Sequence, residues 1–262
     1  MKLNLYQIDA FTDEIFKGNP ACVVPLENWL PKKTLLSIAK ENAVSETAFF
    51  IKKDKKFHLR WFTPEVEMDL CGHATLAAAH CLKSILDYKE DKIIFETISG
   101  ELTVTFQKDF YSMDFPSRPP VISELPKVIS EALNILPNEV YKSRDYLLVY
   151  QSEKEIKKIE INKQILDKIN LGTGGVIVTS KGKECDFVSR YFTPKSSILE
   201  DPVTGSSHCS LVPFWANRLN KYSLKAKQLS ERGGTLKCSL MRDRVMISGK
   251  ATTYFQGKIS IK

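Results

Sequence analysis

An internal repeat constrains the fold of this chain more than any other feature of its sequence. The segment Arg60–Pro64 (RWFTP) recurs as Arg190–Pro194 (RYFTP), at an offset of 130 residues. Two further pairs of segments match at offsets of 133 and 134: Cys71–Thr75 with Thr204–His208, and Ser99–Leu102 with Gly233–Leu236. Three matches in the same order favour duplication over chance. We therefore expect two halves that share one fold and pack about a pseudo-twofold axis.

The hydrophobic patterning predicts clusters of short strands that single helices interrupt. Strands are indicated by short apolar runs and by period-two alternation, as at Leu102, Val104 and Phe106. This pattern favours an α+β fold over a doubly wound parallel sheet. Helices are expected over Lys33–Asn42, His73–Ile85, Lys127–Leu133, Ile161–Lys168 and Ser206–Leu219.

Three prolines near the middle of the chain predict a linker. Pro116, Pro119 and Pro120 lie close together, and such a run continues neither a helix nor a strand. We expect an N-terminal domain over residues 1–117 and a C-terminal domain over residues 121–262. The last strand of the chain can return to the first domain.

The composition is that of an ordinary globular protein, with 43% hydrophobic and 26% charged residues among 262. No apolar run approaches the ~20 residues that a membrane span needs, and the first residues lack the apolar core of a secretory signal. The six cysteines show no paired CxxC spacing, which indicates reduced thiols. We therefore expect a cytoplasmic protein that contacts no membrane.

The formal net charge of +7 raises the question of nucleic-acid binding. The lysines lie in short mixed runs such as Lys52–Lys56 (KKDKK), which are typical of solvated turns. No recognised nucleic-acid-binding motif accompanies them. We therefore expect no nucleic-acid partner, whereas a mild positive field would help to gather a small anion.

A glycine opens a helix-like segment in both repeats, at Gly72 and at Gly205. Glycine permits a close approach of the backbone, and the first N–H groups of a helix lack acceptors within that helix. Such a helix start attracts a carboxylate or a phosphate. One glycine-led helix alone would indicate little. The matched pair predicts a small-anion site at Gly72 and at Gly205 with Ser206.

Glu46 is the candidate for moving protons. It lies at the start of a predicted strand and, at the offset of 130, aligns with Val176, so only one half carries a carboxylate at this position. A half-buried carboxylate with a raised pKa can donate and accept a proton near neutral pH. The alternative is that Glu46 caps a strand edge in water, and the alignment alone leaves both interpretations open.

Two further polar residues lie near the predicted helix starts. His73 follows Gly72 directly, and Asp201 lies four residues before Gly205. A histidine at a helix start is often a capping residue, and Asp201 would also complement the helix dipole. Their matched places in the two repeats favour substrate contacts.

Five segments, in this order along the chain, resemble the phenazine-biosynthesis (PhzF-like) family: Gln7–Thr12, Gly18–Ala21, Ser45–Thr47, Asp69–Thr75 and Glu200–Ser206. The resemblance extends from Tyr6 to about Gly257, and the family belongs to the superfamily of diaminopimelate epimerase and proline racemase. It implies two pseudo-symmetric epimerase-like domains, each a mostly antiparallel barrel-like sheet around a central helix, with the active site between them. Characterised members isomerise a dihydro-hydroxyanthranilate by proton transfer and form homodimers.

The resemblance implies an isomerase that uses no metal and no organic cofactor, with a small carboxylated compound as its substrate. Glu46 matches the general acid/base of the family. His73 and Asp201 match the family residues that orient the substrate. The family residues that hold the substrate carboxylate match three positions: Gly72, Gly205 and Ser206.

The chain departs from the epimerases of the superfamily, which place a cysteine before the glycine in each half. Cys71 precedes Gly72 here, but Thr204 precedes Gly205. A threonine hydroxyl is too weak an acid to replace a thiol, which argues against racemisation by two thiols. Cys71 is either a small apolar filler or a thiol of lowered pKa, and we favour the first.

Two other functions stay open. A metal-dependent hydrolase is suggested by the grouping of Cys71, His73, His80 and Cys81. However, His73 and His80 are two helical turns apart, and the chain has no HExxH motif. A non-catalytic protein that binds small anions would keep the same residues without turnover.

Overall fold

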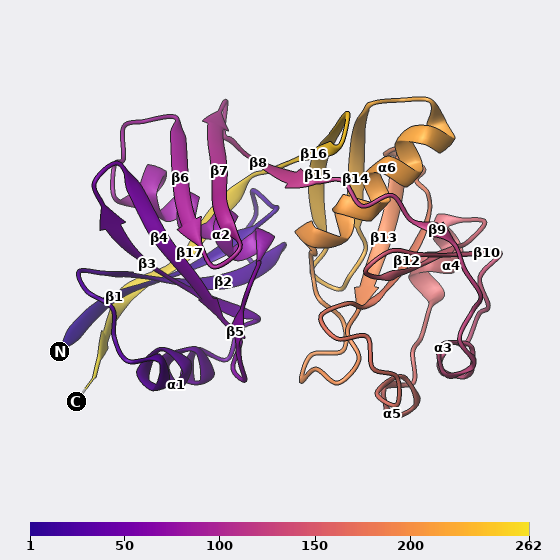
Figure 1. The fold of residues 1–262 in the computed structure, drawn as a ribbon, viewed down its shortest axis with the longest axis horizontal. Coiled ribbons are helices and arrows are strands. Elements are labelled where there is room, and N and C mark those ends of the chain that lie inside the picture. The colour runs from indigo at the N-terminus through magenta and orange to yellow at the C-terminus, as the bar shows by residue number, and fades with distance from the viewer. Residues whose placement is uncertain (262) are drawn as a thin grey trace. The chain divides into compact units, whose positions relative to one another are not determined.

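The computed structural model describes residues 1–261 and confirms the expected α+β class (Figure 1). The first strands are β1 (Lys2–Ala10), β2 (Asn19–Leu26), β3 (Glu46–Lys53), β4 (Lys56–Phe62), β5 (Glu67–Met68), β6 (Lys92–Thr97), β7 (Gly100–Gln107) and β8 (Phe110–Pro116). The later strands are β9 (Val121–Ile122), β10 (Glu139–Lys142), β11 (Tyr146–Val149), β12 (Val176–Lys181), β13 (Phe187–Phe192), β14 (Ser223–Gln228), β15 (Gly234–Met241), β16 (Arg244–Gly249) and β17 (Ala251–Ser260). The α-helices are α1 (Lys32–Asn42), α2 (Gly72–His80), α3 (Lys127–Ala132), α4 (Glu153–Lys158), α5 (Lys163–Leu166) and α6 (His208–Leu219).

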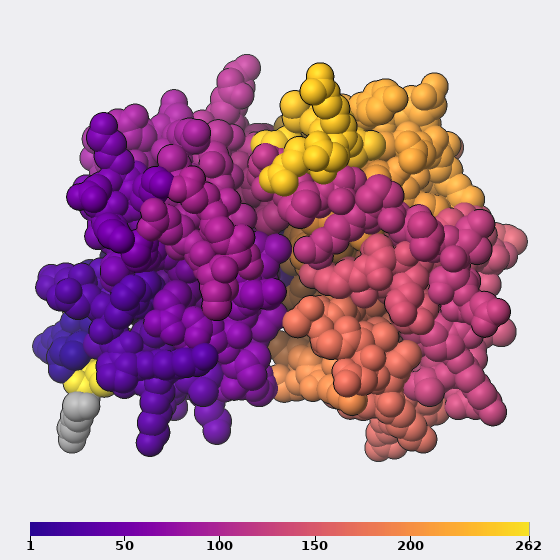
Figure 2. Space-filling model, in the orientation of Figure 1, coloured from indigo at the N-terminus to yellow at the C-terminus, as the bar shows by residue number. Residues whose placement is uncertain are grey.

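The chain forms two compact units. The N-terminal unit contains Met1–Asp114 and the segment from Ser248 onward, and the C-terminal unit contains Phe115–Ile247. The last strand, β17, pairs antiparallel with β1, so the yellow C-terminal residues lie beside the indigo N-terminal residues in Figure 2. The C-terminal unit is therefore shorter than the range 121–262 expected for the second domain.

The two units share one order of strand pairing. In the N-terminal unit, β2 pairs parallel with β3, β3 antiparallel with β4, β4 parallel with β6, and β6 antiparallel with β7. The same alternation runs through β11, β12, β13, β14 and β15 in the C-terminal unit. Helix α2 packs against β1, β2, β3 and β17, and α6 packs against β14 and β15. All residues of α2 are buried, because its sequence is almost entirely small or apolar.

The repeated arginines make the same contacts in both units. Arg60 forms a two-pronged ion pair with Glu67, with N–O distances of 2.7 and 3.0 Å. Arg190 does the same with Glu200, at 2.7 and 2.8 Å. Each guanidinium also lies over the phenylalanine ring two residues later in its strand. Duplicated residues that keep duplicated contacts support the common origin of the two units.

Three helices differ from the sequence expectations. The helix expected over His73–Ile85 is α-helical to His80 and continues as a π-helix over Cys81–Ile85. The helix expected over Ile161–Lys168 is shorter, because Ile161 forms a β-bridge with Leu133 instead. Helix α6 begins later than expected, after a 3₁₀ turn over Gly205–Ser207. Within residues 1–261, we find no helix that is both long and apolar enough to cross a membrane.

Candidate functional site

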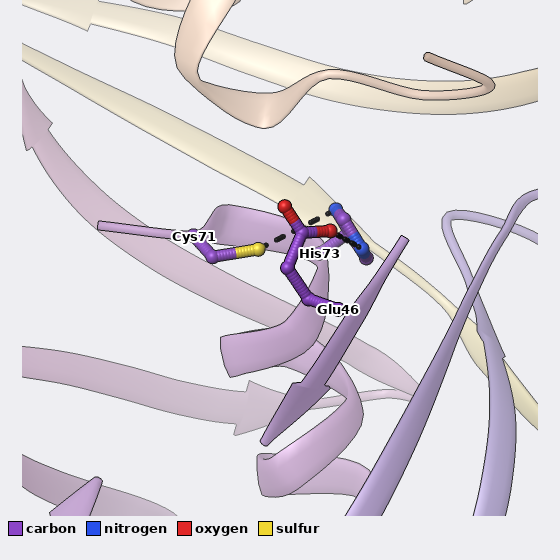
Figure 3. Close-up of side chains that lie close together, drawn as sticks. All are labelled: Glu46, Cys71 and His73. Carbon is purple, nitrogen blue, oxygen red and sulfur yellow. Dashed lines mark hydrogen bonds and ion pairs between the residues drawn. The ribbon is translucent and has the colours of Figure 1, made fainter. Parts of the chain in front are cut away.

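Three reactive side chains meet at the start of α2 in the N-terminal unit: Glu46, Cys71 and His73 (Figure 3). The Nε2 atom of His73 lies 3.0 Å from Oε2 of Glu46, and its Nδ1 atom lies 3.6 Å from Sγ of Cys71. The contact with Glu46 is a close ion pair that lacks the alignment of a hydrogen bond. The side chain of His73 is 5% exposed and that of Glu46 is 14% exposed. Glu46 is therefore a half-buried carboxylate rather than a solvated strand cap.

The local backbone explains why these residues converge. Glu46 is the first residue of β3, which pairs parallel with β2 at Ala21. Cys71 has an extended backbone, with φ −144° and ψ 111°, and α2 begins at Gly72. His73 therefore lies in the first turn of α2, where the helix dipole favours a nearby negative charge. The helix start and the imidazole both complement the carboxylate of Glu46.

The electrostatics of the cluster favour a charged imidazole and a neutral thiol. Burial alone would lower the pKa of His73, but the Cys71 sulfur and the Glu46 carboxylate raise it well above its ordinary value. Burial and the Glu46 carboxylate raise the pKa of the Cys71 thiol. Because the thiol therefore stays neutral near pH 7, we attribute the raised pKa of His73 to Glu46.

Two residues that the sequence analysis did not single out complete the surroundings of His73. The side-chain amide of Asn19 lies 3.1 Å from Nδ1 of His73, and the Ser45 hydroxyl donates to Oδ1 of Asn19 at 3.4 Å. Asn19 is fully buried at the start of β2. The amide nitrogen of Asn19 and the carboxylate of Glu46 thus face the two ring nitrogens of His73.

His80 and Cys81, which the sequence grouped with His73, belong to a different environment. Nε2 of His80 lies 2.9 Å from Oγ1 of Thr253, and its Nδ1 lies 3.2 Å from the Tyr111 hydroxyl. Burial lowers the pKa of His80 to about 4. Burial raises the pKa of Cys81 to about 12. Both residues are neutral structural groups at neutral pH.

The buried histidines are expected to titrate in different pH ranges. His73 should titrate above pH 6.5, whereas His80 and His208, whose pKa burial lowers to about 4, should titrate in acid. The stabilisation from His73 is then complete below the unfolded pKa of about 6.5 and is lost as the pH rises through its folded pKa. His80 and His208 instead destabilise the fold as the pH falls from about 6.5 towards 4. NMR titration of the ring nitrogens measures all three, and a His73 pKa below 6.5 would contradict the ion pair.

In the C-terminal unit, Asp201 lies beside the residue that replaces the second cysteine of the epimerases. The Thr204 hydroxyl donates a short hydrogen bond to Oδ2 of Asp201. The Gln228 side chain donates to the Asp201 carbonyl at 2.7 Å and accepts from the Thr204 N–H at 2.9 Å. Thr204 therefore orients Asp201 and has no free role as an acid or a base.

Ser206 contacts a buried ion pair that the sequence analysis missed. Nη2 of Arg144 donates to Oγ of Ser206 at 3.0 Å and to Oδ2 of Asp145 at 2.9 Å. Asp145 is 1% exposed and also accepts from the Gly175 N–H at 2.8 Å and from the Tyr191 hydroxyl at 3.0 Å. The 3₁₀ turn that precedes α6 thus has a guanidinium, paired with Asp145, next to the serine that follows Gly205.

The strand register corrects the counterpart of Glu46. Thr47 pairs with Phe62 in the N-terminal unit, and Val176 pairs with Phe192 in the C-terminal unit. Because Phe62 and Phe192 are equivalent in the repeat, Thr47 corresponds to Val176, and Glu46 corresponds to Gly175. A Cβ atom on Gly175 would lie 2.7 Å from the Tyr191 hydroxyl, which occupies that space. The conclusion that only one unit has the carboxylate is unchanged.

Comparison with known proteins decides the family. The profile of the family described as Phenazine biosynthesis-like protein (PhzC-PhzF) matches residues 8–257. The chain belongs to this family. A Pseudomonas aeruginosa protein named an uncharacterized isomerase is 47% identical over 261 residues and covers 100% of both chains.

Solved structures agree with this membership. A PhzF-family phenazine biosynthesis protein of Enterococcus faecalis has 44% identity and a TM-score of 0.96, with 100% of both chains covered. A P. aeruginosa protein described as a predicted epimerase has a TM-score of 0.76 at 18% identity, over 99% of this chain and 100% of that chain. The second likeness concerns the fold alone, and it confirms the epimerase-like architecture.

The site of this PhzF-family protein also contains three donors of the kind that bind metals. A carboxylate oxygen of Glu46, Sγ of Cys71 and a ring nitrogen of His73 all lie within 4.8 Å of one another. The sequence did not indicate this grouping, because Glu46 lies far from Cys71 and His73 along the chain. A metal needs a thiolate and a neutral imidazole, whereas the environment favours the thiol and the imidazolium. Metal binding would therefore have to displace two protons.

Proposed function

We propose that this PhzF-family protein is an isomerase that moves a proton within a small carboxylated substrate without a metal or an organic cofactor. The observation that carries this proposal is the half-buried ion pair of Glu46 and His73, because it couples one carboxylate to a charged imidazole at a helix start. The isomerase names among its relatives support the same reaction class.

In the proposed reaction, Glu46 takes a proton from a carbon of the substrate. The electron pair of that C–H bond moves into the adjacent conjugated system, towards the substrate carboxylate. Glu46 then returns the proton to a second carbon on the same face. The atoms of substrate and product are identical, so the reaction needs no oxidant, reductant or co-substrate.

The neighbours of Glu46 have separate roles in this proposal. The His73 imidazolium lies beside the Glu46 carboxylate and balances its negative charge between proton transfers. Asp201, held by Thr204, orients the substrate from the C-terminal unit. The helix starts at Gly72 and at Gly205 with Ser206 hold the substrate carboxylate by their backbone N–H groups.

Cys71 takes no direct part in this mechanism. Its thiol is buried, and its raised pKa keeps it protonated near pH 7. A second thiol would stand where Thr204 lies, and that hydroxyl is committed to Asp201. We also propose, from the family resemblance, that the protein acts as a homodimer in the cytoplasm.

Two alternatives predict different results in a single experiment. Protein treated with a chelator is incubated in D₂O with carboxylated dihydro-aromatic and amino-acid-like compounds, and deuterium entry at carbon is followed by NMR. We expect exchange to continue at the untreated rate. Loss of exchange that returns with Zn²⁺ would support the metal enzyme, for which Glu46, Cys71 and His73 are the donors. No exchange with any compound, before or after treatment, would support the binding protein.

A further inference from the structure

Arg144 contacts one of the three residues that we propose hold the substrate carboxylate, which are Gly72, Gly205 and Ser206. Among residues 1–261 it is the one cationic side chain with such a contact. It lies just before β11 in the C-terminal unit, and its Nη2 atom lies 3.0 Å from Oγ of Ser206. The Arg144 side chain is 25% exposed. A guanidinium stays charged at any physiological pH, and here the carboxylate of Asp145 balances its charge.

The fold fixes the position of this guanidinium. Nε and Nη2 of Arg144 both donate to the carboxylate of Asp145, at 3.2–3.3 Å and 2.9 Å. Asp145 in turn is fixed by the Gly175 N–H and by the Tyr191 hydroxyl. A Cβ atom on Gly174 would lie 2.6 Å from the Arg144 carbonyl, so glycine at this position permits the close approach of the two loops. Because the buried Asp145 carboxylate also accepts from a backbone N–H and a tyrosine hydroxyl, it holds the Arg144 guanidinium in one position.

The N-terminal unit has a neutral group in a similar, although not equivalent, place. Strands β2 and β11 occupy the same place in the pairing order, and a side chain at or just before the beginning of each contacts the residue after the glycine. The strand register makes Asn19 the counterpart of Ser143, one residue before Arg144. In the N-terminal unit this contact joins the Asn19 amide to His73 at 3.1 Å. In the C-terminal unit it joins the Arg144 guanidinium to Ser206. The contact in the N-terminal unit is therefore made by a neutral amide, and the contact in the C-terminal unit by a guanidinium that is paired with Asp145.

We propose that Arg144 is a specificity-determining residue of this enzyme: by donating to the Ser206 oxygen it directs the hydroxyl proton towards the substrate, and it thereby favours a carboxylate over a neutral substrate group. This inference rests on the proposed function and deepens it. The Ser206 oxygen accepts from Arg144, which leaves the hydroxyl proton to be donated to a substrate oxygen. An amide in place of the carboxylate would lose most of this charge-assisted interaction.

Binding of two matched probes tests the proposal without any turnover. The probes are 2-aminobenzoate and its neutral amide, 2-aminobenzamide, titrated by calorimetry against wild type, Arg144→Gln, Arg144→Lys and Arg218→Gln. Arg218 pairs with Glu139 elsewhere on the same unit and is the matched control. Arg144→Gln alone leaves the buried Asp145 carboxylate without its cation. The double variant Arg144→Gln/Asp145→Asn removes both charges and therefore controls for this effect.

We expect wild type to prefer the carboxylate, and Arg144→Gln and the double variant to lose about 10–100-fold of that preference, typical of a charged hydrogen bond. Arg144→Lys should recover part of it, and Arg218→Gln should keep it. An equal loss of both probes would show a structural role only, and no preference in wild type would overturn the carboxylate subsite. Glu46→Gln should keep the preference, so failure of proton transfer and failure of this inference are separable.

Discussion

The variant Glu46→Gln is expected to lose proton transfer by about 10²–10⁴-fold, the range typical of a general acid–base residue. Glutamine keeps the shape and the hydrogen-bonding capacity of the side chain, but it cannot accept a proton from carbon. The ion pair with His73, at 3.0 Å, becomes a neutral contact. Turnover or deuterium exchange under saturating substrate measures the loss.

The control for this variant is Glu46→Asp, which keeps the carboxylate but withdraws it by one methylene. We expect its activity to lie between those of wild type and Glu46→Gln, because the base is present and misplaced. Circular dichroism and binding of 2-aminobenzoate should be unchanged in Glu46→Gln. Exchange that is unchanged in Glu46→Gln would exclude this carboxylate as the base.

The variant Asp145→Ala should destabilise the fold by about 3–5 kcal/mol, as expected when one partner of a buried ion pair is removed. The Arg144 guanidinium would lose its buried carboxylate, and the Gly175 N–H and the Tyr191 hydroxyl would lose their acceptor. Each unsatisfied donor adds to the cost. Denaturant unfolding, followed by a probe in the C-terminal unit, measures the change.

Asp145→Asn should cost less than Asp145→Ala, because an amide oxygen still accepts two of these hydrogen bonds. The exposed pair of Glu184 with Lys227 supplies the matched control, and Glu184→Ala should leave the unfolding midpoint nearly unchanged. Equal destabilisation by Asp145→Ala and Glu184→Ala would contradict the structural role of the buried pair.

Much of the architecture was predictable from the repeat. The recurrence of Arg60 and Arg190 in one pentapeptide predicted two related halves, and both arginines make the same ion pair and the same ring contact. Gly72 and Gly205 both open helical segments as expected. A repeat predicts structure because duplicated residues keep the same local environment in each copy.

The partners of the site were less accessible, because they come from elements far apart in the sequence. Asn19 reaches His73 across 54 residues, and Arg144 reaches Ser206 across 62. Asn19 lies in one of the segments that resemble the family, but its spacing from His73 does not indicate the contact, and Arg144 lies in none of those segments. The correct counterpart of Glu46, Gly175, needed the strand register, since a shift of one residue is invisible in an ungapped alignment.

One missed element did have a signal in the sequence. Helix α4 begins with a capping box, in which the Ser152 side chain accepts from the Glu155 N–H and the Glu155 side chain accepts from the Ser152 N–H. The spacing S-x-x-E is the known signature of such a helix start. A short helix with little apolar periodicity is predicted from its capping residues rather than from an apolar face.

The central claim is that one carboxylate, and no thiol, moves the proton. The most direct test follows deuterium entry at carbon in D₂O for wild type, Glu46→Gln and Cys71→Ala, side by side with the same substrate. We expect Cys71→Ala to keep most of the wild-type exchange, because the Cys71 thiol is protonated and Thr204 supplies no second thiol. We expect Glu46→Gln to lose at least about 10²-fold. Exchange that is abolished in Cys71→Ala and preserved in Glu46→Gln would contradict the single-carboxylate mechanism and establish a thiol-based one.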